Sequence, residues 1–203
     1  MMNNEFSRRR GTTLIEALVY TVIFGLVLTC IYWVLIASMR YYSVANDSID
    51  LQQSALNSMS TLVQDLCESQ STSIYTFTSP SGILFVSPRD SSNQYTYDAK
   101  MNLQYQKWVC YYVGTSNGVN YLYKKELTIT PTADPAVVPG YATTSDFAGD
   151  SALPKRTIGK YINTLECNNA SGVVTTIANF EKSPGTDKQN LLEIRNETKL
   201  RNI

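Results

Sequence analysis

The chain has 203 residues, which is enough for one domain with a hydrophobic core and an additional helix. Its 17 basic and 17 acidic residues balance, so the overall charge gives no attraction to nucleic acid or to anionic lipid. Histidine is absent, which excludes a Ser-His-Asp triad and removes the commonest transition-metal ligand. We therefore expect a protein that is not an enzyme and that has no cofactor and no metal site.

The first segment in chain order is basic and then strongly apolar. Three consecutive arginines precede Gly11: Arg8, Arg9 and Arg10. Residues 17–39 carry no charge, and about 20 apolar residues in a helix cross the bilayer core. This run predicts a transmembrane helix, with its basic end in the cytoplasm by the positive-inside rule. A cleaved secretory signal is disfavoured by the length of the run, whereas a plain signal anchor is an alternative.

Glu16 is a carboxylate at the start of this apolar run. A charged side chain costs about 2.5–3.5 kcal/mol near the centre of a bilayer and less toward its edge, so such residues are usually functional. The alternative is that the Glu16 side chain simply extends into the lipid headgroups.

The junction Arg-Arg-Gly followed by Thr12-Thr13-Leu14-Ile15-Glu16 and a long apolar helix resembles the processing site of type IV prepilins and of type II secretion pseudopilins. The resemblance implies that residues 1–11 are a leader, which a prepilin peptidase recognises by its arginines and cuts between Gly11 and Thr12. It implies N-methylation of Thr12 and a role for Glu16 in filament assembly. Most family members have phenylalanine at the first mature position, so Thr12 is a departure.

Residues 12–39 are then the transmembrane half of a longer helix, and residues 40–70 its amphipathic half. Apolar residues recur there at spacings of three and four, which predicts one buried face. These residues are Leu51, Ala55, Leu56, Met59, Leu62, Val63 and Leu66. We expect this face to pack on a sheet, with a coiled-coil seam as the alternative, and the helix to end between Cys67 and Ser71.

Residues 71–203 read as a β-rich head. Period-two patterns predict strands at 83–86, 101–113, 119–129, 156–167, 173–180 and 191–194. Asn117-Gly118 predicts a hairpin turn, the proline-rich segment 131–154 a loop, and the polar residues 195–203 a frayed tail. The expected fold is α+β, pilin-like, with the long N-terminal helix packed on an antiparallel sheet.

Candidate ligand groups in the head are sparse. Cys67, Cys110 and Cys167 allow at most one disulfide, whose pairing is open, and their spacing disfavours zinc. The carboxylates of the 131–154 loop lack the spacing of a calcium site; they are Asp134, Asp146 and Asp150. The basic pair Lys124-Lys125 is too small for nucleic-acid binding, and we expect it to be a solvated strand end.

The order of an apolar strand at 83–88, an aromatic strand at 107–113 and then Leu122-Tyr123-Lys124-Lys125 is similar to J-type minor pseudopilins and W-type minor pilins. In those proteins arginine stands where Lys124 and Lys125 are found. The resemblances imply a structural subunit at or near the tip of a type II secretion pseudopilus or a type IV pilus. An alternative is a pilus-tip binding module, serving as an adhesin or in DNA uptake.

That family also implies a location and partners. The chain would sit in the inner membrane as a single-pass protein, N-terminus inside, with an extracytoplasmic head. Its partners would be the prepilin peptidase, sister pilins or pseudopilins, and the inner-membrane assembly platform.

Overall fold

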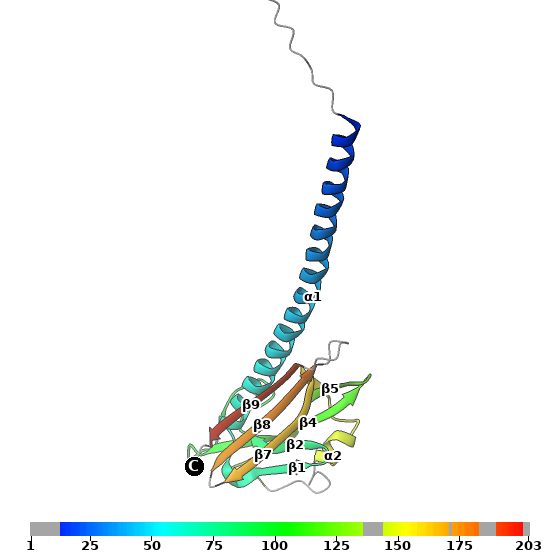
Figure 1. The fold of residues 1–203 in the computed structure, drawn as a ribbon. Helices are drawn as coiled ribbons and strands as arrows, with labels where there is room; N and C mark the ends of the chain where they lie inside the picture. Colours follow the sequence, from blue (N-terminus) through cyan, green and yellow to red (C-terminus); the bar gives the residue numbers. More distant parts are fainter. Residues whose placement is uncertain (1–12, 136–143, 171, 183–189, 201–203) are drawn as a thin grey trace, which may run out of the picture. The chain divides into compact units, whose positions relative to one another are not determined.

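The computed structural model describes residues 13–135, 144–170, 172–182 and 190–200, which form an α+β fold (Figure 1). It contains a long helix, α1 (Leu14–Cys67), a short helix, α2 (Thr144–Gly149), and two antiparallel sheets. The chain divides into two compact units, Met1–Asn46 and Asp47–Ile203, and α1 contributes to both. The predicted fold class is therefore confirmed, except that two sheets replace the single expected sheet.

The first sheet has the strand order β1-β2-β4-β5-β6, with the short β3 paired to β4, and the second has the order β7-β8-β9. A single 3-10 turn, η1 (Ser71–Ser73), precedes β1. The strands of the first sheet are β1 (Ile74–Thr78), β2 (Ser81–Ser87), β3 (Thr96–Tyr97), β4 (Leu103–Ser116), β5 (Val119–Thr132) and β6 (Arg156–Lys160). Those of the second are β7 (Ile162–Ala170), β8 (Val173–Lys182) and β9 (Asn190–Lys199).

The hairpin between β4 and β5 forms at the predicted turn. Asn117 and Gly118 both have positive φ, 51° and 74°, and Ser116 pairs with Val119 across the turn. Two successive positive φ values are what a two-residue type I′ turn requires, and asparagine and glycine tolerate them best.

One predicted strand, 156–167, is wrong as a single element, because it bends at Tyr161 and enters both sheets as β6 and β7. Tyr161 has a φ of 67°, which is unusual for a bulky residue. Its N–H donates to the carbonyl of Asn120 at 2.7 Å, and its own carbonyl accepts from the N–H of Glu181 at 2.7 Å. Tyr161 is thus the corner at which the chain leaves the first sheet for the second.

The main hydrophobic core lies between α1 and the inner faces of both sheets. The helix contributes Leu51, Ala55, Met59, Leu62 and Leu66, which pack with first-sheet residues such as Phe85 and second-sheet residues such as Leu165 and Phe180. The predicted stripe is confirmed at these five positions. Leu56 is 63% exposed instead, Val63 is half-buried, and Ser58, which is not part of the predicted stripe, is buried.

A second cluster covers the other face of the first sheet. Phe147 of α2 packs there among Leu84, Val86, Trp108 and Tyr112. Because both faces are covered, β2 has consecutive buried residues rather than alternating ones.

Helix α2 lies in the segment 131–154 that was expected to be loop, of which residues 136–143 are outside the described part. Lys125 of β5 is buried, and its ammonium donates to the carbonyls of Phe147, Ala148 and Asp150 at 2.7, 3.1 and 2.6 Å. These are carbonyls at the C-terminal end of α2, which a cation satisfies well. Burial lowers the pKa of Lys125, while the nearby Asp150 opposes the shift. The expectation of a solvated lysine is wrong here.

The expected frayed tail is also wrong within the described residues. β9 continues to Lys199, Thr198 and Leu200 are buried, and the N–H of Leu200 donates to the carbonyl of Gly172 at 2.9 Å. Leu200 belongs to the main core, which explains why a polar sequence is held as a strand.

Two serine hydroxyls fasten the layers together in the same way. Ser54 of α1 accepts from the N–H of Lys160 at 2.8 Å and donates to its carbonyl at 2.9 Å. Ser81 of β2 accepts from the N–H of Leu165 at 2.9 Å and donates to the Leu165 carbonyl. Each hydroxyl therefore satisfies both backbone groups of a residue at a sheet edge.

We expect Gly159→Ala to destabilise the head by about 1–3 kcal/mol because β6 passes very close to α1 at this glycine. A methyl group on Gly159 would collide with Ser58 Oγ and lie 3.2 Å from the Ser54 carbonyl oxygen. Gly149→Ala is the matched control, since nothing lies within 4 Å of its added methyl group. Chemical denaturation measures both free energies of unfolding, and equal values would contradict the close approach.

Candidate functional site

Helix α1 begins with a reciprocal pair of hydrogen bonds between Thr13 and Glu16. The Thr13 N–H donates to Glu16 Oε2 at 2.9 Å, and the Glu16 N–H donates to Thr13 Oγ1 at 3.3 Å. This is the capping box, in which threonine and glutamate three residues apart satisfy two N–H groups at a helix start. Glu16 thus has a local role that our sequence reasoning missed, although the Thr-x-x-Glu spacing signals it.

The remaining residues of the predicted processing site lie outside the described residues: Arg8, Arg9, Arg10, Gly11 and Thr12. Thr13, directly before α1, and Glu16, in its first turn, are both exposed. A carboxylate at this place also interacts favourably with the positive end of the helix dipole.

Within the described part of the first unit, no other element packs against the apolar side chains of the first half of α1. Its large side chains are widely exposed, for example Leu14 at 84% and Trp33 at 67%. Its most apolar 18-residue window has a mean hydropathy of 2.4, and none of that window is buried. By length and composition, α1 therefore contains a segment able to span a membrane. A bare apolar surface of this size needs lipid or other helices to cover it.

The second half of α1 is held at its start by an ion-pair cluster. Lys182 at the end of β8 contacts Asp47 Oδ1 at 2.8 Å and Asp50 Oδ2 at 3.2 Å, and its ammonium lies 4.9 Å from the Tyr161 ring centre. Burial alone would lower the pKa of Lys182, but the two carboxylates outweigh it and raise the pKa. The ammonium thus joins α1 to the second sheet.

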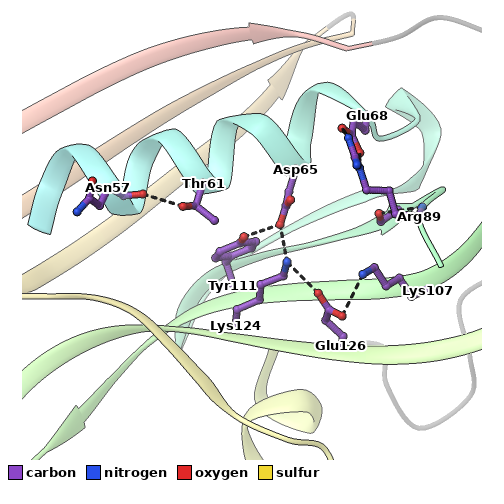
Figure 2. A network of polar contacts seen from close by, with 10 residues as sticks. Asn57, Thr61, Asp65, Glu68, Arg89, Lys107, Tyr111, Lys124 and Glu126 are labelled. Carbon is purple, nitrogen blue, oxygen red and sulfur yellow. Dashed lines mark hydrogen bonds and ion pairs between the residues drawn. The ribbon is translucent and has the colours of Figure 1, made fainter. Parts of the chain in front are cut away.

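A polar network joins the other end of α1 to the first sheet (Figure 2). Asp65 Oδ2 accepts from the Tyr111 hydroxyl at 2.6 Å and contacts Lys124 Nζ at 2.7 Å. Lys124 also contacts Glu126 at 2.8 Å, and Glu126 contacts Lys107 at 3.0 Å. Burial, followed by the charge of Asp65, raises the pKa of Tyr111, so the phenol stays protonated as a donor. Lys124, like Lys125, is not the solvated residue we expected.

Arg89 holds Glu68, the residue that directly follows α1. Its guanidinium binds both carboxylate oxygens of Glu68, donates to the Asn93 carbonyl at 3.1 Å, and lies 4.8 Å from the Tyr95 ring centre. Burial alone would raise the pKa of Glu68, but hydrogen bonds from Arg89 and Tyr95 outweigh it and lower the pKa. A bidentate arginine–carboxylate pair is geometrically specific, so it fixes where the helix ends on the sheet.

The cysteines are free thiols. Cys67 is exposed at the end of α1, Cys110 is buried in the second cluster, and Cys167 packs against the main core. Burial raises the pKa of Cys110 and of Cys167 to about 12, so both remain unreactive thiols at neutral pH. Cys30, in the apolar half of α1, is exposed.

No group of three or more His, Cys, Asp or Glu side chains suited to a metal ion occurs among the described residues, which include Asp134, Asp146 and Asp150. The charged groups gathered around the second half of α1 pair with one another. Their arrangement positions a helix on two sheets.

No family model matches the chain, and neither curated proteins nor solved structures match it.

We expect acid to weaken the hold on the end of α1. Because the folded pKa of Glu68 is lowered, its carboxylate contributes stability above its unfolded pKa of about 4.3 and loses it as pH falls through the folded value. Glu68→Gln should therefore lose about 1 kcal/mol at pH 7 and much less near pH 3.

Glu193→Gln, exposed on β9, is the control for this experiment. Denaturation at both pH values measures the two differences. A Glu68→Gln loss that is equally large at pH 3 would contradict the ion-pair account.

Proposed function

We propose that this chain is a minor pilin or pseudopilin, a structural subunit at or near the tip of a type II secretion pseudopilus or a type IV pilus. The observation that carries the proposal is the division of one helix into two kinds of surface. The first half of α1 is apolar, bare and headed by Glu16, whereas the second half forms the core of a β-rich head. A subunit anchored in a membrane and assembled through helix contacts needs both surfaces in one element.

Cleavage after Gly11 would leave a positive amine at Thr12, at the start of the apolar half. An unpaired charge there is expensive, and a carboxylate of a neighbouring subunit would neutralise it. Glu16 is the acidic residue in the first turn of α1, and its capping bond to Thr13 engages Oε2. Oε1 is then available to a second donor, so capping and pairing between subunits are compatible.

The proposed location follows from the same residues. The arginines of the leader face the cytoplasm, α1 crosses the inner membrane, and the head lies outside the cytoplasm. The peptidase, sister subunits and the assembly platform are the proposed partners, because each acts on the leader, the helix or the anchored subunit.

Processing is tested by mass spectrometry of the protein from cells with and without an active prepilin peptidase. We expect the mature chain to begin at Thr12, with a mass increase of one methyl group at its amine. A chain that begins upstream of Thr12 in cells with the peptidase would remove the basis of the family assignment.

Assembly is tested by separating the charge of Glu16 from its cap. Glu16→Gln retains an oxygen that can accept from Thr13 N–H but lacks the charge, Glu16→Ala loses both, and Thr13→Ala loses only the threonine side of the cap. We expect all three to be cleaved, with both Glu16 variants absent from sheared filaments and Thr13→Ala present. Immunoblots of membrane and filament fractions measure this. Normal incorporation of Glu16→Gln would show that capping, not charge, is what matters.

A further inference from the structure

The outer strands of the two sheets differ in how well they are protected against pairing with another chain. Apart from the two-residue strand β3, they are β1 and β6 in the first sheet and β7 and β9 in the second. An unprotected outer strand has backbone N–H and C=O groups that invite pairing with another chain, and proteins usually block such edges with charges, prolines, bulges or covering elements.

Three of these strands are protected. Ser54 occupies both backbone groups of Lys160 on β6, and Ser81 does the same for Leu165 on β7. β9 instead carries charged side chains of alternating sign on its exposed face: Glu193, Arg195, Glu197 and Lys199.

β1, with the sequence Ile-Tyr-Thr-Phe-Thr, has no charge, no proline and no bulge in its pairing with β2, although β7 of the second sheet lies close to it. Within the described part of the chain, its backbone makes no hydrogen bond to any element beyond β2. β-branched and aromatic residues of this kind favour a paired strand.

A groove of about 590 Å³ lies along β1. Thr76, Phe77 and Thr78 of β1 form one wall, and the second sheet forms the other. Cavities of about 300–1,000 Å³ are typical of ligand sites in proteins. Because the second sheet closes the far side, the groove suits a single extended strand better than the edge of another whole sheet.

The wall on the second sheet has a defined chemical pattern. Glu166, Ile177 and Arg195 are direct cross-strand partners on β7, β8 and β9, so their side chains form one row in the groove. Arg195 pairs with Glu197 at 3.2 Å. Glu166 has no ion pair among the described residues. The row therefore offers an apolar contact at Ile177 and an unneutralised carboxylate beside it.

We propose that β1 accepts an extended segment of a partner protein as an additional strand of the first sheet. The segment has apolar side chains that contact Phe77 and Ile177, and a basic side chain that pairs with Glu166. Backbone pairing supplies the affinity, and the groove supplies the specificity, as in other cases of strand addition. This assigns a partner surface to the head and goes beyond the structural role proposed above.

The test uses the full chain in detergent micelles and a fluorescent, end-blocked hexapeptide, Thr-Val-Lys-Val-Thr-Val. Two further peptides carry N-methyl groups on alternate amides, one on the odd set and one on the even set. Because a strand directs alternate N–H groups toward its neighbour, we expect one methylated peptide to bind at least tenfold more weakly and the other to bind like the parent. Failure of the parent to bind at millimolar concentration, or equal binding of all three, would overturn the proposal.

Variants of the protein locate the site. Thr76→Lys places a charge on the edge of β1 and should weaken parent binding at least tenfold, whereas Thr130→Lys, an exposed threonine of β5 outside the groove, should leave it unchanged. Replacing lysine by glutamate in the peptide should weaken binding to the wild type, and Glu166→Gln should abolish that preference. Equal effects of Thr76→Lys and Thr130→Lys would argue against β1.

A second copy of the chain is the competing occupant. Sedimentation of the wild type and of Thr76→Lys distinguishes the two cases. A monomer at all concentrations supports a foreign strand, whereas a concentration-dependent dimer that Thr76→Lys abolishes would show that β1 pairs with itself and would overturn the proposal.

Discussion

Burial of one face of α1 between two sheets is the contact on which the head depends. Five helix residues at spacings of three and four enter a core with residues of β2, β4, β7 and β8, and without that face neither inner sheet surface would be covered. Full burial of a large apolar side chain stabilises a fold by about 1.5–3 kcal/mol, so these residues together outweigh any single polar contact described above. The ion pairs at Lys182, Asp65 and Arg89 then fix the position of α1 along the sheets.

The regular parts of this fold follow from local patterns in the sequence. The helical stripe, the Asn117-Gly118 hairpin and the strands around Trp108 and Tyr123 each carry a periodicity or a turn residue that a short window reveals. Tyr161 could not be found in this way, because a left-handed tyrosine has no local signal and depends on Asn120 and Glu181 from distant strands. The same holds for Lys125, whose burial makes sense only once the carbonyls of α2 surround it.

In the candidate site, too, some residues could be found from the sequence and others could not. Glu16 was found by its position after a glycine and within an apolar run, but its bond to Thr13 shows that the same carboxylate serves the helix itself. The polar network at Asp65 was missed because its members come from α1, β4 and β5, and each looks like an ordinary surface residue in the sequence. The unpaired edge of β1 was missed because this strand was not predicted. Whether a strand lies at the edge of a sheet also depends on the positions of all other strands, which the sequence pattern does not give.

The contacts of α1 with the second sheet also constrain how the protein is made. Ser54 bonds to Lys160, and Asp50 pairs with Lys182, across sequence separations of 106 and 132 residues. A chain synthesised from its N-terminus therefore carries the apolar face of α1 uncovered until most of the head has been translated. Late long-range contacts of this kind slow folding and leave hydrophobic surface open to aggregation. The newly made head thus passes through a stage in which this apolar face is exposed.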